Sequence, residues 1–132
     1  MTSLITGVDF VSLPTQDLSA AMDFYGDVLG LERSSLWQRE GEDPLGAEFE
    51  TGTVTISLIA AGKIGIPFQA NKVPVAFHVE DVEAARAELS SRGIDFPAET
   101  IDSGVCHMAN FHDPDGNALM LHHRYAPKPP RD

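Results

Sequence analysis

The sequence contains the same order of predicted elements twice, and this repeat limits the possible folds more than any other feature. In each half, an aspartate suited to capping a helix follows a short apolar strand, and a glycine suited to a left-handed backbone ends the helix. Asp17 and Gly30 occupy these positions in the first half, and Asp81 and Gly93 occupy them about 64 residues later. Each half is therefore expected to fold as β-α-β-β-β.

Alternation of apolar and polar residues predicts the extent of each element. In the first half we expect a helix from 18 to 29 and strands at 8–15, 32–38, 47–51 and 54–60. In the second half we expect a helix from 82 to 92 and strands at 73–79, 94–96, 105–111 and 118–123. At 132 residues the chain suits one domain, because neither half alone covers its apolar sheet face.

The predicted fold class is α+β, built from two paired βαβββ modules. Each module is expected to be a sheet with one helix, and each needs the other to cover an exposed apolar sheet face. We place module one at about 8–61, a linker at 62–72, module two at about 73–124 and a tail at 125–132.

The strongest local signal is the segment from Asp113 to Asn117, which predicts a tight turn between two strands, with Gly116 in the left-handed conformation. If Asp113 faces Asn117, side-chain alternation divides the hairpin into two faces. One face would carry Met108, Asn110, His112, Ala118, Met120 and His122. The other would carry Ala109, Phe111, Leu119 and Leu121, an apolar set suited to packing against a helix.

Charge and composition exclude several classes of function. Nine Lys and Arg against twenty Asp and Glu give a net charge of −11, which would repel nucleic-acid phosphates. No apolar run approaches the ~20 residues that span a bilayer, and the N-terminus lacks signal-peptide features. The single cysteine, Cys106, suits a buried strand position better than a nucleophile. We therefore expect a cytoplasmic protein that binds neither nucleic acid nor membrane.

Acidic residues are concentrated in one segment of the first half. They are Glu40, Glu42, Asp43, Glu48 and Glu50. One interpretation is a solvated loop and edge strand that keep the protein soluble. The other is a negative rim that attracts a cationic small molecule. The sequence leaves both open.

Short motifs resemble those of the vicinal oxygen chelate superfamily, which includes glyoxalase I, extradiol dioxygenases, fosfomycin resistance enzymes and bleomycin resistance proteins. The first-module motifs are Asp17-Leu18, Phe24-Tyr25 and Leu29-Gly30-Leu31. The second-module motifs are 79–82 followed by Arg92-Gly93, and 113–117 followed by Leu119-Met120-Leu121. The resemblance covers about residues 8–124. It implies the fold, in which each module is a curved mixed sheet with one helix and the pair forms an open half-barrel cavity, whereas activity has to be argued from the site.

In metal-dependent members of that superfamily, each module places one ligand on its first strand and one on its last. The resemblance assigns these positions to Phe10, Ser57, Pro74 and Met120. Phenylalanine and proline side chains cannot coordinate a metal, and serine and methionine are poor ligands for Zn²⁺, Mn²⁺ or Fe²⁺. We therefore expect no cofactor, with a divalent metal held elsewhere as the alternative.

Histidines are the remaining candidates for metal binding or acid–base catalysis. Alternation places His78, His112 and His122 on the cavity side. His112 and His122 are four positions apart along the hairpin, on the order of 13 Å, which is too far to share an ion. His78 with His122 is the only plausible metal pair, and any of the three could serve as a general acid or base. His107 and His123 are expected near strand ends, outside a metal site.

The predicted cavity combines apolar surface with a few hydrogen-bonding groups, which suits a small organic ligand. Its lining is expected to be Phe10, Ser12, Thr55, Ser57, Ala76, His78, Asn110, Met120 and His122, with Trp37 as an aromatic wall. Alternatively, Phe10 and Met120 fill the space and leave no pocket.

Three hypotheses on function follow. The first is a metal-free protein that resembles the bleomycin resistance branch and binds a small organic molecule, with a cation favoured by the charge of −11. The second is a glyoxalase-like lyase, isomerase or dioxygenase that uses a relocated metal or a cavity histidine. The third is a structural or regulatory dimer with a closed pocket. A homodimer is expected because pairing would cover exposed strand edges.

Overall fold

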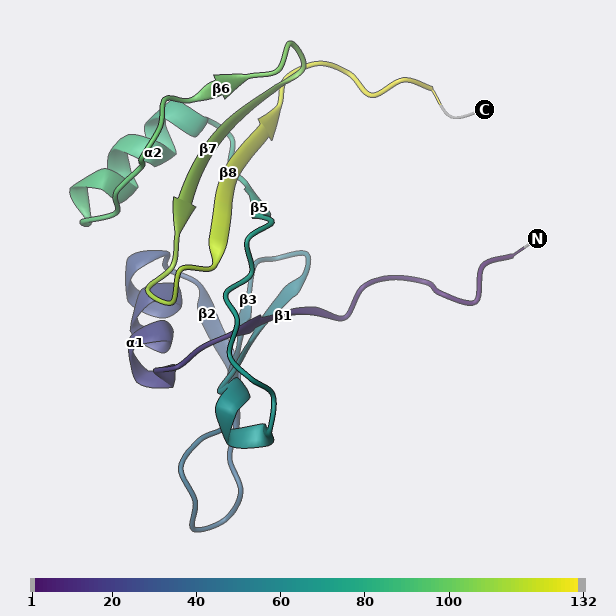
Figure 1. The fold of residues 1–132 in the computed structure, drawn as a ribbon. Helices are drawn as coiled ribbons and strands as arrows, with labels where there is room; N and C mark the ends of the chain where they lie inside the picture. Colours follow the sequence, from purple (N-terminus) through teal and green to yellow (C-terminus); the bar gives the residue numbers. More distant parts are fainter. Residues whose placement is uncertain (1, 131–132) are drawn as a thin grey trace. The chain divides into compact units, whose positions relative to one another are not determined.

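The computed structural model describes residues 2–130, whose helices and strands follow the repeated order predicted from the sequence (Figure 1). The contacts divide the chain into two compact units, one up to Ala70 and one from Asn71. This division falls in the segment expected as the linker. Residue 1 and the final two residues of the predicted tail lie outside the described range. Within that range, no helix combines the length and apolar character that crossing a bilayer requires.

The first unit is a four-stranded mixed sheet with one helical segment, and α1 contacts β3 and β4. Its elements are β1 (Phe10–Pro14), α1 (Leu18–Asp23), a turn of π-helix η1 (Phe24–Val28), β2 (Glu32–Trp37), β3 (Gly46–Glu50), β4 (Thr55–Ile59) and a 3-10 turn η2 (Ala61–Ile64). The strand order is β1-β4-β3-β2, with β1 parallel to β4 and the other pairs antiparallel. As predicted, the Asp17 carboxylate accepts a hydrogen bond from the Ala20 amide at 3.1 Å.

The second unit repeats this arrangement, with α2 against β7 and β8. Its elements are β5 (Val75–His78), α2 (Val82–Ser91), β6 (Ile101–Asp102), β7 (Cys106–His112) and β8 (Ala118–Arg124). The strand order is β5-β8-β7-β6, and β5 is parallel to β8. Asp81 caps α2 through the Ala84 amide at 3.0 Å, as predicted.

The strand predicted at 94–96 is wrong, since the second strand of this unit is β6. The Ile94 amide instead donates to the Leu89 carbonyl, and the Gly93 amide donates to that of Ser90, both at 3.0 Å. These two bonds form a Schellman C-cap with Gly93 at φ +94°. Phe96 then packs its ring 5.3 Å from that of Phe111. Helix capping and core packing therefore use the residues that the sequence pattern assigned to a strand.

The face of each sheet toward its helix forms the core. In the first unit this face is made by Leu13, Ala47, Phe49, Ile56 and Leu58. In the second it is made by Ala109, Phe111, Leu119 and Leu121, the apolar set predicted for the hairpin. Burying a leucine, isoleucine or phenylalanine side chain completely stabilises the folded state by roughly 1.5–3 kcal/mol relative to leaving it exposed. Cys106 is also buried, in β7.

The predicted hairpin is confirmed in register and in turn conformation. His112 pairs with Ala118, and Gly116 has φ +86°. Asp113, which is 6% exposed, accepts hydrogen bonds from the amides of Asp115 and Asn117, both at 2.9 Å. The fully buried Asn117 side chain accepts from the Asn71 amide at 2.8 Å. The turn is thus an internal structural junction that holds the start of the second unit on β8.

Candidate functional site

The face of the first sheet away from α1, here called the first open face, carries most of the polar side chains of that unit's sheet. Register assigns to it Phe10, Ser12, Pro14, Glu32, Ser35, Trp37, Gly46, Glu48, Glu50, Thr55, Ser57 and Ile59. Three of these side chains are glutamates, and none is Lys, Arg or His. The face therefore presents negative charge without a basic counterpart of its own.

Glu48 lies at the centre of this face. It pairs with Ser57 on one side and with Ser35 on the other, and Ser12 continues the same row on β1. The Ser35 hydroxyl donates to the Glu48 carboxylate at 2.7 Å. The row is polar from one edge of the sheet to the other, so it offers hydroxyl groups on both sides of a carboxylate.

Glu50 is the second central carboxylate. The Thr55 hydroxyl donates to its Oε1 at 2.7 Å, and the Ser34 hydroxyl donates to its Oε2. Ser34 reaches this carboxylate because the β2–β3 register shifts between Arg33 and Ser35, which brings an additional residue to the edge. The hydrogen bond from Ser34, followed by that from Thr55, lowers the pKa of Glu50 below its usual value. Glu50 is therefore anionic at neutral pH.

Aromatic side chains lie on the two outer strands of the same face. Trp37 on β2 is 42% exposed, and Phe10 on β1 is 53% exposed. Trp37 pairs with Gly46, where a Cβ would lie 2.6 Å from the Leu58 carbonyl oxygen and 3.5 Å from the indole ring. Because Gly46 has no side chain, the indole can lie over this part of the sheet.

Five of the residues predicted to bind a ligand lie on this face. They are Phe10, Ser12, Trp37, Thr55 and Ser57. The acidic pattern of the sequence predicts a rim or an edge strand for Glu48 and Glu50, and it does not identify them as partners of Ser57 and Thr55. The edge assignment is wrong, since β3 lies between β4 and β2. Alternation along 46–50 was the signal that could have placed both carboxylates beside the hydroxyls.

The face of the second sheet away from α2, here called the second open face, has a different composition. Register assigns to it Ala76, His78, Ile101, Met108, Asn110, His112, Ala118, Met120 and His122. It includes the remaining predicted ligand-binding residues, His78, Asn110, Met120 and His122. The face contains no carboxylate, so it offers thioether, imidazole and amide groups.

The four positions that family resemblance assigns to metal ligands do not fit a metal site. Phe10 and Ser57 lie in the first unit, where Phe10 pairs with Thr55 and Ser57 pairs with Ser12. In the second unit, Met120 pairs with Ala76, and Pro74 precedes β5. None of these four side chains supplies an imidazole or a carboxylate.

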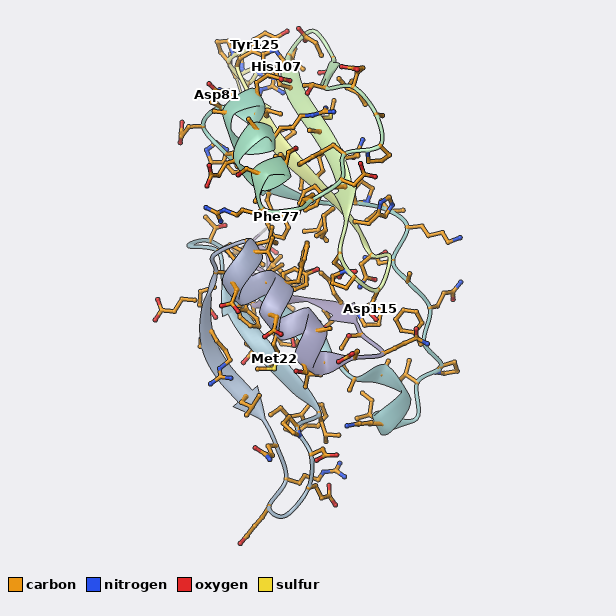
Figure 2. All side chains as sticks on the ribbon, turned by 90° about the vertical axis from the view of Figure 1, so that its left-hand side faces the viewer. Met22, Phe77, Asp81, His107, Asp115 and Tyr125 are labelled. Carbon is orange, nitrogen blue, oxygen red and sulfur yellow. The ribbon has the colours of Figure 1, made fainter. Side chains whose placement is uncertain are left out.

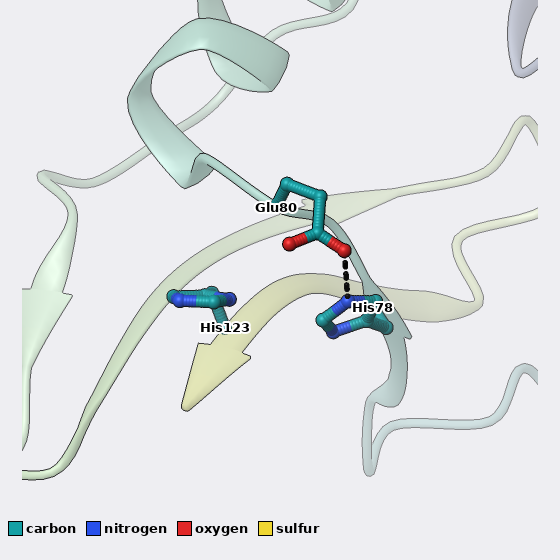
Figure 3. A group of neighbouring side chains, drawn as sticks. All are labelled: His78, Glu80 and His123. Atoms are coloured by element: carbon teal, nitrogen blue, oxygen red, sulfur yellow. Dashed lines mark hydrogen bonds and ion pairs between the residues drawn. The ribbon is translucent and has the colours of Figure 1, made fainter. Parts of the chain in front are cut away.

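The structure brings together a different group of potential ligands in the second unit. His78, Glu80 and His123 each offer one ligand atom, and these atoms all lie within 4.8 Å of one another (Figure 3). His78 pairs in register with His122, the partner expected from the sequence, but the group includes His123 instead. Sequence alternation does not predict this arrangement, because it places His122 and His123 on opposite sides of β8. No sequence motif assigns a ligand role to Glu80, which follows the end of β5.

A second polar cluster lies at the start of β7 and the end of β8, where Tyr125 and His107 are neighbours (Figure 2). The Tyr125 hydroxyl donates to Asp102 at 2.8 Å, and the Gly104 amide donates to the same carboxylate oxygen at 2.9 Å. The bond from Gly104, followed by that from Tyr125, lowers the pKa of Asp102. The hydrogen bond to Asp102 also raises the pKa of Tyr125. This cluster ties the chain after β8 to β6.

A hollow of about 700 Å³ lies elsewhere in the first unit, between the start of α1, the loop before β3 and η2. It is lined by Thr15, Gln16, Asp17, Leu18, Ser19, Met22, Asp23, Asp43, Pro44, Ala60, Gly62, Lys63 and Phe68. Lys63 lies 4.0 Å from the Asp43 carboxylate. No residue predicted to bind a ligand lines this hollow, so it provides an internal comparison for the first open face.

Comparison with known proteins gives a consistent family assignment. The family model of the Glyoxalase/Bleomycin resistance protein/Dioxygenase superfamily matches residues 7–121. No curated protein sequence matches the chain. Among solved structures, an antibiotic binding protein, TnmS3 from Streptomyces sp. CB03234, is similar with a TM-score of 0.76 and 22% identity, over 93% of this chain and 99% of that one.

Two further solved structures show the range of similar proteins. A glyoxalase/bleomycin resistance protein/dioxygenase from Nocardioides has a TM-score of 0.74 and 26% identity, over 99% of this chain and 91% of that one. A lactoylglutathione lyase from Agrobacterium tumefaciens has a TM-score of 0.69 and 20% identity, over 89% of this chain and 93% of that one. The similar structures thus include both a binding protein and an enzyme.

Proposed function

The chain belongs to the glyoxalase/bleomycin resistance protein/dioxygenase superfamily, and we propose that within it this protein binds a small organic cation on the first open face without transforming it. The observation that carries the proposal is the pair of central carboxylates, Glu48 and Glu50, set among hydroxyl groups on a face that contains no basic side chain. The net charge of −11 also favours a positively charged ligand.

The geometry supports a division of roles on this face. Glu48 and Glu50 supply the counter-charge, and charge-assisted hydrogen bonds to carboxylates are stronger than neutral ones. The neighbouring hydroxyls of Ser35 and Thr55 already orient the two carboxylates, which reduces the ordering that binding would require. The exposed indole of Trp37 provides a surface for stacking or for a cation–π contact.

Similarity to TnmS3, described as an antibiotic binding protein, supports binding as a function that this fold can perform. At 22% identity that similarity concerns the fold, so the class of ligand rests on the residues of this chain. The four family positions without metal-binding side chains favour a ligand held directly by protein groups.

Intrinsic fluorescence can test the proposal, because Trp37 is the only tryptophan and lies on the proposed site. Untagged protein would be titrated with aromatic cations such as trimethylphenylammonium, and with tert-butylbenzene as the neutral isostere. We expect saturable quenching by the cations and little by the isostere. Absence of saturation with every cation tested, or equal affinity for the neutral isostere, would contradict the proposal.

Charge-neutralising variants then locate the site. Glu48→Gln and Glu50→Gln should weaken binding of the cation, whereas Asp23→Asn in the hollow near α1 should leave it unchanged. Each variant removes one negative charge, so the comparison separates local contacts from net charge. If Asp23→Asn has the larger effect, the ligand occupies the hollow and the proposed location is wrong.

An enzymatic function is the second candidate, because one similar structure is a lactoylglutathione lyase and His78 pairs with His122 on the second open face. Either imidazole could act there as a general acid or base. Isomerase, lyase and dioxygenase assays on the wild type, His78→Ala and His122→Ala would test this function. Turnover that both substitutions abolish would support it, and an unchanged rate in both would exclude a role for these residues.

We also expect the protein to form a homodimer. The outer strands of each sheet pair on one side with a neighbour among the described residues. They are β1 and β2 in the first unit and β5 and β6 in the second, and pairing between copies could cover their outer edges. Sedimentation analysis would test this, and a mass near that of one chain would contradict it.

A further inference from the structure

His78, Glu80 and His123 lie where two neighbouring parallel strands of the second unit end. His78 is the last residue of β5, Glu80 lies in the short connection between β5 and α2, and His123 is near the end of β8. Figure 3 shows the Glu80 carboxylate between the two imidazole rings in this view. Two of the three side chains are largely exposed, at 66% for His78 and 89% for Glu80.

The distances suit coordination of one ion. Nε2 of His78 is 3.1 Å from Oε1 of Glu80. Ligand atoms held at ~2.0–2.1 Å in tetrahedral geometry lie about 3.3 Å from one another, so this pair is already close to that spacing. All three ligand atoms fall within 4.8 Å of one another, and the exposed Glu80 side chain can adjust without repacking.

His123 provides a second, independent observation. Its Nδ1 is buried and has no hydrogen-bond partner within the described part of the chain. Leaving a buried polar atom unpaired is unfavourable, and such atoms are rare in folded proteins. His123 also packs its ring 5.8 Å from that of His78. No hydrogen bond among the described residues therefore uses this ring nitrogen.

We propose that His78, Glu80 and His123 form a site for a divalent transition metal, with zinc as the reference ion. Two imidazoles and one carboxylate match the donors that Zn²⁺ prefers, whereas Ca²⁺ and Mg²⁺ prefer oxygen ligands alone. Three protein ligands leave a fourth position for solvent. None of the three residues is among Phe10, Ser57, Pro74 and Met120, so this site differs from the one that family resemblance suggests.

The site also has a structural consequence that goes beyond the proposed ligand binding. β5 is an outer strand of four residues, and within residues 2–130 it pairs with β8 alone. An ion held by His78 and Glu80 from one strand end and by His123 from the other would link these neighbours. Metal binding should therefore stabilise the second unit, because an ion that binds only the folded state raises stability by mass action.

The experiment uses full-length protein without a histidine tag, stripped of metal by chelator and titrated with Zn²⁺ in competition with a chelating dye. We expect saturation at one equivalent per chain and a rise in thermal midpoint. Ring signals of His78 and His123 should shift in long-range ¹H–¹⁵N spectra, while those of His112 stay in place. His78→Gln and His123→Gln should each weaken Zn²⁺ binding at least tenfold, and Glu80→Gln by a smaller factor.

Two matched controls use residues outside the group. His112→Gln removes an exposed imidazole of β7, and Glu83→Gln removes an exposed carboxylate from the first turn of α2. Both should bind Zn²⁺ like the wild type. Non-saturable binding, or wild-type affinity in His78→Gln or Glu80→Gln, would overturn the proposal. Those two variants change exposed residues, so the test does not depend on how the half-buried His123→Gln variant folds.

Discussion

The two units of this protein have the same strand order and connectivity, but their open faces differ in chemistry. The first open face has two central glutamates among hydroxyls, and the second has histidines, methionines and an asparagine. The buried cores under the helices are alike, since each is mainly aliphatic and includes a phenylalanine from the third strand, Phe49 or Phe111. The clearest difference is therefore on the side that packing against the helix does not constrain.

This comparison shows how a repeated fold can separate stability from function. A helix-facing position has to be apolar because it is buried, and charged residues are almost never buried there without a partner. A position on the open face meets no such requirement from its own helix. The first unit has carboxylates at such positions, and the second has imidazole, thioether and amide groups.

The largest expected effect concerns the turns that join the last two strands in each unit. In the second unit, Asp113→Ala removes a buried carboxylate that accepts from two backbone amides and from the Asn117 side chain. We expect it to lower the free energy of unfolding by about 3 kcal/mol, because buried donors lose their acceptor. Denaturant unfolding would measure this loss.

The matched change in the first unit is Thr51→Ala. The Thr51 hydroxyl donates to the Val54 carbonyl at 2.6 Å and accepts from the Val54 amide at 3.0 Å, but these groups are only partly buried. The expected loss is about 1 kcal/mol. Equal losses in the two variants would show that the hairpin turns contribute alike and that burial of Asp113 does not decide the difference.

The next effect concerns ligand affinity on the two open faces. The double variant Glu48→Gln with Glu50→Gln should weaken binding of an aromatic cation by roughly 10–100-fold, as expected for loss of charge-assisted bonds worth about 1.5–3 kcal/mol. Met120→Leu, on the second open face, should change the affinity less than about threefold, because volume is nearly conserved. A larger effect of Met120→Leu would show that the ligand binds to the second unit. Tryptophan fluorescence or calorimetry would distinguish these outcomes.

The smallest effect concerns the pH dependence of stability at two carboxylates, the half-buried Glu50 and the exposed Asp102. The pKa of Asp102 is lowered from 3.8 and that of Glu50 from 4.5, so each favours the folded state when ionised. Each carboxylate contributes its full stabilisation when the pH is above its pKa in the unfolded chain. The stabilisation is lost as the pH falls through the lower pKa that the same group has in the folded protein. The stability difference between wild type and Asp102→Asn, or Glu50→Gln, should therefore be constant near neutrality and shrink below about pH 4.

Tyr125→Phe provides a control for this prediction, since it removes one of the donors to Asp102 and leaves the carboxylate in place. It should reduce the acid dependence attributed to Asp102 but not that attributed to Glu50. Urea unfolding at a series of pH values would measure all three variants. A difference that persists unchanged into acid would show that the carboxylates act through packing instead of charge.

Local sequence signals were sufficient for the repeated elements and for the hairpin register. Asp17 and Asp81 cap helices through short-range contacts, and Gly116 allows a turn that few other residues adopt. The strand predicted at 94–96 failed because Ile94 completes the C-cap of α2 and Phe96 packs on Phe111. An apolar pattern of three residues cannot distinguish these uses from pairing in a sheet.

The candidate sites were only partly predictable for a related reason. Alternation places Thr55 and Ser57 on one face, but it does not say which carboxylates lie beside them. The bulge at Ser34 and the proximity of His78 to His123 each depend on contacts between strands that are distant in sequence.

By itself, the sequence determined the two βαβββ modules, the helix caps, the apolar faces and the absence of suitable ligands at the family's metal positions. These features depend on residue type and on contacts within a few residues. Only the tertiary structure decided that Glu48 and Glu50 lie beside the hydroxyls of neighbouring strands, and that His123 joins His78 and Glu80. Both groupings arise from strand register and side-chain packing, which bring together residues that no local pattern relates.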